Sequence, residues 1–536
     1  MSREDLISLM KIVQEQTKKK DTEIQLLKDK QKELEFLNAM LSDRLTLAQR
    51  KQFGASSEKY AEGYEQMNLF NEAEASADAE TEELFEEIRP SSYKRKKRKG
   101  KKEEDLSNFE TVETRTYKLE GEARYCPECG KKYSVVTKET VKRLRFVPAK
   151  FEVEEEITYV YSCPKCGAMK RPEKEPSLIR GSIATPSLVA GIMNAKYVNG
   201  MPLARQEREF ARYDLDLSTK TMANWIINCA DRYLKPLYQL MKEELLESRY
   251  IHCDESRIQV LGEPEQKGTT QNWMWVYLTD EFSGSPQMVL FDYERTRAGY
   301  HPVNFLGNRF HGYLTCDGYQ AYHSLGEGII ISGCLTHARR RFDAALTALK
   351  KDFTKEQLKE TVAYQAMSRI GILYKIEEML HDKTPEEKYE ERQKQSRPVM
   401  DAMFEWLHTM EDSVDRSSLI GDAILYTLNQ EVYLRRYLED GHLSIDNNSA
   451  ERALKNFAVG RRNWLFAKSV RGADASALVY SITETALLNY LKPYAYLTYI
   501  LDELRKMGAF PKEEELKKLL PWSENLPEYC RTKLKK

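Results

Sequence analysis

Long apolar runs and a disulfide framework are both missing from this chain of 536 residues. No uninterrupted apolar stretch reaches the roughly 20 residues that a membrane span needs. The first segment, MSREDLISLMKIVQEQ, lacks the apolar core of a signal peptide. Nine cysteines, an odd number spread over a long chain, argue against a secreted protein held together by disulfides. These absences predict a cytoplasmic protein with no membrane partner.

An excess of charge of either sign is also missing, because the formal net charge is −1 at pH 7. A chain without net charge has no general attraction to nucleic acid, so any binding to DNA must come from local basic patches. The chain is too long for one hydrophobic core. We therefore expect a multidomain α+β protein.

Residues 1–52 are predicted to form a coiled coil, which would make the protein a homodimer or a higher oligomer. Polar residues at three core positions, Thr17, Gln31 and Asn38, would set the register of such a coil. The apolar core positions are Leu6, Met10, Val13, Ile24, Leu27, Leu34, Leu41 and Leu45. The alternative is a single amphipathic helix packed on its own chain.

Residues 53–105 are predicted to be a charged, flexible linker. Residues 72–87 hold eight acids and no base, whereas residues 94–102 hold eight bases and one glycine. Blocks of like charge are usually solvated. A sharper alternative is a tether to the DNA backbone that the acidic block screens until DNA competes for it.

Two matching cysteine motifs predict a zinc-ribbon-like module at residues 106–175. In CPECG and CPKCG, glycine permits the turn that aims backbone N–H groups at the thiolates. Each motif is a tight turn called a zinc knuckle, and a strand-like segment joins the two. This arrangement favours one tetrahedral site of four thiolates over four free cysteines. The expected ligands of structural Zn²⁺ are Cys126, Cys129, Cys163 and Cys166.

Residues 176–247 have the amphipathic pattern of several helices with short breaks. Ser218 is a candidate helix cap, and Met222 and Trp225 would anchor the helix that follows it. A helix, a short turn and a second helix resemble a helix-turn-helix that binds DNA. A helical connector that only packs on its neighbour is the alternative.

Five strand-like segments in residues 248–342 predict the first part of an α/β catalytic core. The first three are predicted to form an antiparallel meander, and two more follow after a helix-like segment. Five strands of mixed direction flanked by helices are typical of a ribonuclease H-like fold, in which the first and fourth strands lie side by side. Asp254 and Asp317 would then lie close enough to share a metal ion.

Residues 343–440 predict an all-helical insertion, and residues 441–490 would complete the core. Asp446, Asn447 and Asn448 make a good helix cap, which places Glu451 in the first turn of the helix. That helix would deliver Glu451 to the two aspartates. Residues 491–536 are predicted to be a helical tail.

Asp254, Asp317 and Glu451 all lie beside apolar segments of the sequence. A charge buried there costs several kcal/mol unless it is paired or bound to a cation. Carboxylates are preferred ligands of Mg²⁺ or Mn²⁺, and two such ions about 3.5–4 Å apart activate an attacking oxygen and stabilise the leaving one. Asp254 would bridge the two ions. The rival carboxylates are Glu255, Asp280, Asp292 and Asp446.

Basic residues gather in the sequence near these carboxylates and are candidate contacts to DNA phosphates. The candidates are His337, Arg340, Arg341, Arg452, Lys455, Arg461, Arg462 and Lys468. Their alternative role is a solvated charged face. Trp464 and Phe466 are predicted to be core residues rather than platforms for a base.

These motifs together resemble the insertion sequence 66 family, the large DDE-type transposases of bacteria, over nearly the whole chain and in family order. The matching segments are RKQFGASSEKY, CPECG, CPKCG, MPLARQEREF, IHCDES, CDGYQAY, CLTHARRRF, IDNNSAERALKNFAVGRRNWLF and ETALLNYLKPYAYLTYIL. The resemblance implies a leucine-zipper-like segment, a zinc-binding module and a ribonuclease H-like domain with a helical insertion. It also implies that Asp254, Asp317 and Glu451 are the catalytic triad.

The expected function is DNA transposition in the bacterial cytoplasm, in association with the nucleoid. The protein would nick the ends of an insertion sequence and join the 3′-hydroxyl to target DNA. Its partners would be double-stranded DNA and, as such elements commonly encode them, accessory proteins. The alternatives are a non-catalytic, zinc-containing regulator that binds DNA and a nuclease that cuts without joining.

Overall fold

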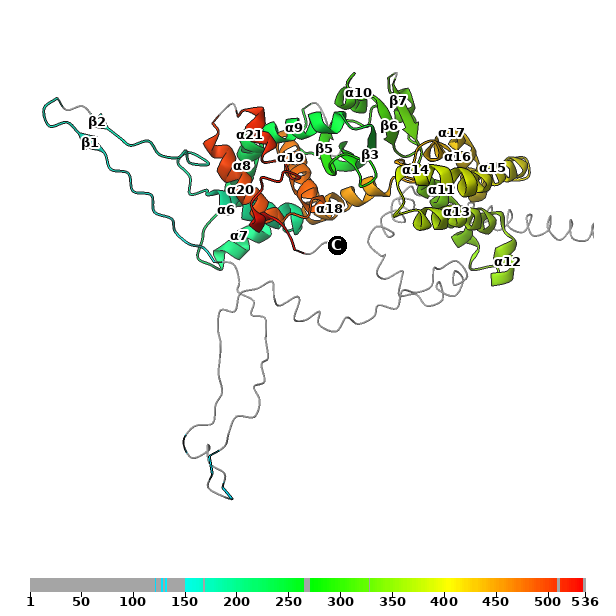
Figure 1. Cartoon of the computed structure of the whole chain (residues 1–536), viewed down its shortest axis with the longest axis horizontal. Helices are drawn as coiled ribbons and strands as arrows, with labels where there is room; N and C mark the ends of the chain where they lie inside the picture. The colour runs from blue at the N-terminus through cyan, green and yellow to red at the C-terminus, as the bar shows by residue number, and fades with distance from the viewer. Residues whose placement is uncertain are drawn as a thin grey trace, which may run out of the picture. The chain divides into compact units, whose positions relative to one another are not determined.

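The computed structural model describes residues 150–533, with gaps at 167–168, 265–269, 327 and 509–510, and a few positions between 121 and 132 (Figure 1). The described residues fall into two compact units, a larger one of residues 176–532 and a smaller one of residues 150–175. The predicted coiled coil and charged linker, and the ligands Cys126 and Cys129, lie outside the described residues.

The larger unit contains a five-stranded sheet in the order β5-β4-β3-β6-β7. β3, β4 and β5 are antiparallel to one another, and β6 and β7 run parallel to β3. The strands are β3 (Tyr250–Gln259), β4 (Gln271–Thr279), β5 (Met288–Glu294), β6 (Gly312–Thr315) and β7 (Ile329–Ser332). The first and fourth of these strands are neighbours, as the sequence predicts.

Helix α19 (Val470–Leu488) protects the outer edge of the sheet. Thr485 accepts a hydrogen bond from the Val289 N–H and donates one to its carbonyl, both at 3.0 Å. Ser481 accepts from the Phe291 N–H at 2.8 Å. Strand edges left open in water pair readily with other chains, and here hydroxyl groups occupy the backbone groups of β5.

The helices that precede the sheet share its hydrophobic core. They are α6 (Pro186–Met193), η2 (Asn194–Val198), α7 (Leu203–Ala211), α8 (Thr219–Cys229), η3 (Ala230–Leu234) and α9 (Lys235–Leu246). Ser218 caps α8, as predicted, by accepting from the Thr221 N–H at 3.2 Å. α20 (Pro493–Lys506) packs against α6, so the predicted C-terminal tail is joined to this same core.

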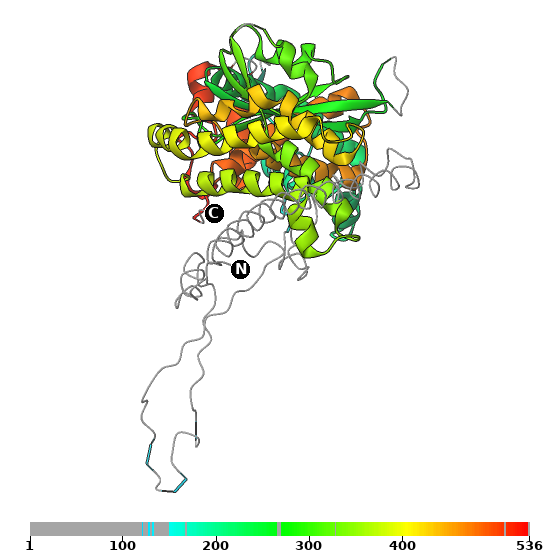
Figure 2. The ribbon, with the colours of Figure 1, turned by 90° about the vertical axis from the view of Figure 1, so that its right-hand side faces the viewer.

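The insertion is helical, as predicted (Figure 1, Figure 2), and its hydrophobic cluster also includes Tyr250 of β3 and Tyr313 of β6. Buried Arg392 pairs with Glu377 and donates to the carbonyls of Tyr437, Asp440 and Leu443, which ties the insertion to the chain that leaves it. Helix α11 (Leu335–Leu349) begins before the predicted boundary at residue 343 and leads into the insertion. The elements that follow are α12 (Lys355–Glu360), α13 (Val362–Met379), α14 (Pro385–Glu391), η5 (Arg392–Ser396), α15 (Arg397–Glu411), α16 (Leu419–Asn429), α17 (Glu431–Leu434) and η6 (Arg436–Leu438).

Helix α18 (Asn448–Trp464) follows the insertion and packs on β3. The remaining short elements of the larger unit are α10 (Tyr300–Leu306), η4 (Gln320–Ser324), α21 (Glu513–Lys517) and η7 (Glu528–Cys530). The smaller unit contains β1 (Tyr161–Ser162) and β2 (Met169–Lys170), which pair antiparallel. Among the described residues, no helix combines the length and the apolar character of a membrane span.

A buried carboxyl group at the contact of α18 with α19 makes the stability of this packing depend on pH. Burial raises the pKa of Glu484 to about 7, although Asn456 donates to its carboxylate at 3.0 Å. The unfolded chain releases this proton near pH 4.3, whereas the folded protein holds it until about pH 7. The free energy of unfolding therefore falls as the pH rises through this window.

We expect Glu484→Gln to remove this pH dependence. Its free energy of unfolding, measured by urea denaturation, is expected to exceed that of the wild type by about 1–3 kcal/mol at pH 8, with a much smaller difference at pH 5. The matched control is Glu514→Gln at an exposed position of α21, which is expected to change neither value. An equal gain at both pH values would contradict the prediction.

Candidate active site

Asp254 lies within β3, and Asp317 lies just beyond the end of the neighbouring parallel strand β6. β3 pairs with β6 in a register that sets His252 opposite Thr315, and the same register carries Asp254 level with Asp317 just beyond the end of β6. Backbone N–H groups hold both carboxylates, from Glu255 to Asp254 at 2.8 Å and from Tyr319 to Asp317 at 2.9 Å. The short parallel ladder thus brings together two residues that are far apart in sequence.

The raised pKa of Asp254 indicates that several carboxylates lie close to it. Burial raises the pKa of Asp254 well above its usual range, and the negative charges of Glu255, Asp317 and Glu451 raise it further. Like charges gathered at one point favour a proton or a cation there. The oxygen donors suit Mg²⁺ or Mn²⁺, which prefer carboxylate ligands. The three predicted residues therefore lie near one another, together with Glu255.

Glu255 differs from the other carboxylates because a cation already faces it. Its buried carboxylate accepts hydrogen bonds from Arg297 and from the Tyr322 hydroxyl. The Arg297 guanidinium also lies 3.9 Å from Asp317 Oδ2 and 3.8 Å from the centre of the Tyr319 ring. Arg297 therefore links the rival carboxylate Glu255 to Asp317, a role that no motif around residue 297 signals.

Glu451 lies in the first turn of α18, as predicted, and is bound by an arginine. Arg340 of α11 makes a two-pronged ion pair with it, with Nη1 at 2.7 Å from Oε1. In the described ranges, no three side chains of His, Cys, Asp or Glu are already closed around one metal position. Arg340, a predicted DNA contact, thus holds the third carboxylate.

A buried network ties the start of α18 to β3. Asn447 is fully buried and donates to the Cys253 carbonyl at 2.9 Å, while its side-chain oxygen lies 2.9 Å from His252 Nδ1. His252 Nε2 lies 3.0 Å from Asp280, which also accepts from Ser444 at 3.0 Å. Asn447 stands at the predicted cap position, but its side chain bonds to the strand and does not cap the helix.

The other predicted DNA contacts lie on α11 and around α18. Arg452, Lys455, Arg462 and Lys468 are exposed, and His337 is half-buried. Arg341 pairs with Asp422, and Arg461 donates to the Arg257 carbonyl. These residues are spread over two helices and the turn after α18.

The remaining sequence candidates separate by their surroundings. Asp446 accepts from Thr336 at 3.1 Å and from the Asn448 amide at 2.7 Å. Asp292 lies on β5, where burial raises its pKa to about 6. Trp464 is half-buried and packs edge-on against Tyr197, as a core residue would. Phe466 is 42% exposed, so the prediction that it belongs to the core is wrong.

The smaller unit shows half of the predicted zinc site. Strands β1 and β2 flank the knuckle that contains Cys163 and Cys166. The N–H groups of Cys166 and Lys165 point at the Cys163 sulfur and lower the pKa of this thiol. That is the arrangement expected of a knuckle that favours thiolate, the form that binds zinc.

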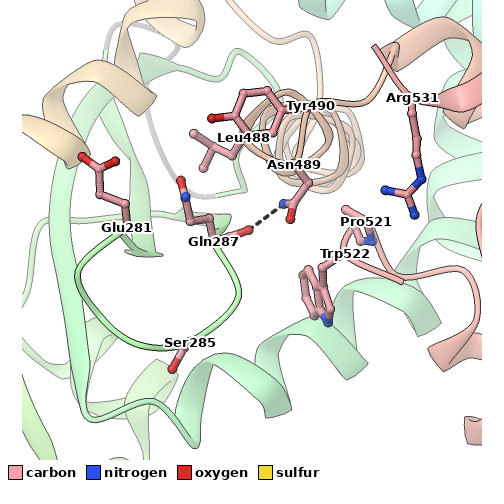
Figure 3. Close-up of a pocket in the computed structure, with 9 residues that line it drawn as sticks. All are labelled: Glu281, Ser285, Gln287, Leu488, Asn489, Tyr490, Pro521, Trp522 and Arg531. Atoms are coloured by element: carbon pink, nitrogen blue, oxygen red, sulfur yellow. Dashed lines mark hydrogen bonds between the residues drawn. The ribbon is translucent and has the colours of Figure 1, made fainter. Parts of the chain in front are cut away.

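A pocket of about 280 Å³ lies elsewhere in the larger unit (Figure 3). It is formed by the turn between β4 and β5, the end of α19 and the C-terminal segment, where Asn489 donates to the Gln287 carbonyl at 2.8 Å. Its lining residues are Glu281, Ser285, Gln287, Leu488, Asn489, Tyr490, Pro521, Trp522 and Arg531. The converging carboxylates do not line it.

Comparison with known proteins identifies the family. The family model described as "Transposase IS66 family" matches residues 181–475, more than half of the chain, including all three carboxylates. The chain belongs to the IS66 family of transposases. Residues 123–167 match the "zinc-finger binding domain of transposase IS66", and residues 40–108 match "Transposase C of IS166 homeodomain".

Proteins similar to this chain occur in Sinorhizobium fredii. The uncharacterized protein y4hP is 31% identical over 412 residues, which are 74% of this chain and 73% of the relative. The uncharacterized protein y4jD is 29% identical over 418 residues, covering 76% of this chain and 79% of the relative. Family membership supports a transposase role with DNA and zinc binding.

We expect Asn447→Ala to loosen the tie between α18 and β3. The change leaves the Cys253 carbonyl and the His252 ring without their buried partner, which costs about 2–4 kcal/mol in the free energy of unfolding. Chemical denaturation measures this loss. Asn448→Ala is the matched control, since Asn448 is less buried and its side-chain amide donates to its neighbour Asp446, and it is expected to cost less than about 1 kcal/mol. Equal losses would contradict the prediction.

Proposed function

We propose that this chain nicks the ends of an insertion sequence and joins the freed 3′-hydroxyl to target DNA by two-metal phosphoryl transfer. The observation that carries the proposal is the register of β3 and β6, which brings Asp254 level with Asp317, with Glu451 near enough for its charge to raise the pKa of Asp254. These residues would be the ligands of Mg²⁺ or Mn²⁺. Family membership supports the transposase role independently.

The arrangement of strands supports a ribonuclease H-like catalytic core. The order β5-β4-β3-β6-β7, with an antiparallel meander followed by two parallel strands, is the pattern expected of that fold. In this proposal residues 248–342 and 441–490 form the core, and residues 343–440 are inserted into it. The inserted helices separate Glu451 from the strands in sequence but not in space.

The residues of the site have separate tasks in this proposal. Bound Mg²⁺ supplies activation of the attacking oxygen and stabilisation of the leaving one. Asp254 and Asp317 hold their carboxylates through backbone N–H groups, and Arg297 holds Glu255 and steers Asp317. Arg340 must release Glu451 before that carboxylate can bind a cation. Freed from Glu451, Arg340 would turn to a DNA phosphate.

The remaining parts of the chain would serve DNA binding and assembly. Double-stranded DNA, as element ends and target, would lie against the exposed basic residues of α18 and the turn after it. The four cysteines would hold one structural Zn²⁺, and residues 1–52 would pair two chains. The helices of residues 176–247 would bind DNA or brace the core, and accessory proteins of the same element would assist.

We expect Asp254→Asn to abolish metal-dependent nicking and strand transfer while it spares binding to the element ends. Losing several kcal/mol of charge stabilisation lowers the rate by about a thousandfold or more. The assay uses a labelled duplex of the element end with Mg²⁺ and any accessory proteins of the element. The control is Asp382→Asn at an exposed position of the insertion, which is expected to retain activity.

Two other outcomes would select the alternatives. Wild-type protein that binds the ends without any metal-dependent cleavage would be a regulator. Wild-type protein that cuts but does not join pre-cut ends to target DNA would be a nuclease.

We expect one zinc ion per chain, measured by elemental mass spectrometry on the purified protein. Cys163→Ser is expected to lose it, because a tetrahedral site needs its fourth thiolate. The melting transition of the larger unit is expected to stay unchanged, because the knuckle belongs to the other compact unit. Cys229→Ala in α8 is the control and is expected to keep the metal. Zinc retained in Cys163→Ser would contradict the proposed ligand set.

A further inference from the structure

Helix α18 and strand β3 run side by side in the same direction and are tied at both ends. At the start, Asn447 donates to the Cys253 carbonyl at 2.9 Å. At the end, the Ala467 N–H donates to Gln259 at 2.9 Å, and the Leu261 N–H donates back to Ala467 at 3.0 Å. The carboxylates thus lie at one end of a braced pair, and the turn of residues 464–467 lies at the other.

The separation of the two ends follows from both elements. From Glu451 to the end of α18, a helical rise of 1.5 Å per residue gives about 20 Å. From Asp254 to Val260, an extended rise of about 3.3 Å per residue gives about 20 Å as well. The turn therefore stands at a fixed distance from the candidate active site.

The backbone of this turn is strained. Leu465 has φ 64° and ψ −42°, and the Phe466 N–H donates to the Trp464 carbonyl at 2.7 Å. This is the positive-φ form of the γ-turn, which is rare for a residue with a branched side chain. Strain of this kind persists only where the surroundings impose it, and it is a reason to look for a function.

The strained turn exposes apolar side chains. Leu465 is 65% exposed and Phe466 is 42% exposed. Trp464, the last residue of α18, packs edge-on against Tyr197 at the base of the turn. The turn returns the chain to β3 at Ala467, but that tie uses backbone groups and does not require a leucine and a phenylalanine to face water. Both side chains are therefore accessible to a partner.

The surroundings of the turn are cationic. Burial lowers the pKa of Arg461, and the positive charges of Arg462 and Arg257 lower it further, so the three guanidinium groups are crowded together. Lys468 follows the turn and is exposed, and Lys196 lies 5.1 Å from the centre of the Trp464 ring. Apolar side chains within a cationic rim fit a base step between its phosphates.

A row of cations leads from the active site toward the turn. Arg452, Lys455 and Arg462 are all exposed on α18, at spacings of three and seven residues. Such spacings put side chains on one face of a helix. A duplex that follows this face would run along α18, from Glu451 to the strained turn.

We propose that Leu465 and Phe466 form a wedge that enters a base step of the bound duplex. At 3.4 Å per base pair, about 20 Å places this step about six base pairs from the reacting phosphodiester. Apolar wedges unstack a step and kink the duplex, which draws more DNA onto the protein. The proposal rests on the proposed function, because it takes the bound partner to be element DNA.

The test uses full-length protein and duplexes of the element's own ends, each with one 2-aminopurine that becomes brighter when unstacked. Ca²⁺ replaces Mg²⁺ so that binding is observed without cleavage, and the probe is moved along the first twelve base pairs. We expect a several-fold rise in fluorescence about six base pairs from the cleaved bond. Asp254→Asn is expected to give the same rise, since it leaves the wedge intact.

The variants separate a wedge from a merely structural turn. Leu465→Gly and Phe466→Ala are each expected to return the fluorescence near that of free duplex and to slow nicking, whereas Phe466→Tyr is expected to restore both. Leu465→Gly relieves the positive φ, so its melting temperature is expected to equal or exceed that of the wild type. Ile183→Ala, at a side chain that is also 65% exposed, is the control and is expected to change nothing.

Three results would overturn the wedge. They are a rise that survives in Leu465→Gly and Phe466→Ala, bound duplex with no rise near the sixth base pair, and a melting temperature of Leu465→Gly below that of Ile183→Ala. If any of these results is found while wild-type protein binds and nicks the element ends, the wedge is wrong and the proposed function stands. Wild-type protein that neither binds nor nicks would remove the proposed function and the wedge together.

Discussion

The hydrogen bonds of Asn447 join β3 to a helix that begins almost two hundred residues later in the chain. The helical insertion lies between them in sequence, and its hydrophobic cluster contacts the sheet at Tyr250 of β3 and Tyr313 of β6, at the end of these strands away from the carboxylates. A buried amide that finds partners only at the Cys253 carbonyl and His252 supplies the position of α18. Because leaving a buried polar group without a hydrogen bond is costly, α18 has one favourable position on the sheet.

The position of that helix decides the electrostatics of the candidate active site. It brings Glu451 near Asp254 in the middle of β3 and Asp317 just beyond β6, and the gathered charge raises the pKa of Asp254. Two arginines restrain this repulsion, Arg297 at Glu255 and Arg340 at Glu451. In the proposed function a bound metal ion would compete with these arginines for the carboxylates, and DNA phosphates would compete with the carboxylates for the arginines.

Much of the larger unit follows from sequence patterns that depend on neighbours in the chain. The five strands, the cap at Ser218 and the position of Glu451 in the first turn of its helix agree with prediction, because alternation and capping are local properties. The prediction of Phe466 as a core residue was wrong, since an aromatic residue after an amphipathic helix reads as buried unless the turn is known. Arg297 has no local signature at all.

The sequence by itself determined which elements form, which carboxylates border them and that the chain belongs among IS66 transposases, since these depend on residue types at short spacing. Only the tertiary structure decided that Asn447 serves the strand and not its own helix, that Arg340 faces Glu451, and that Leu465 holds a strained, exposed turn. The physical reason is that hydrogen bonds, ion pairs and backbone strain are settled between segments far apart in the chain, where spacing carries no information.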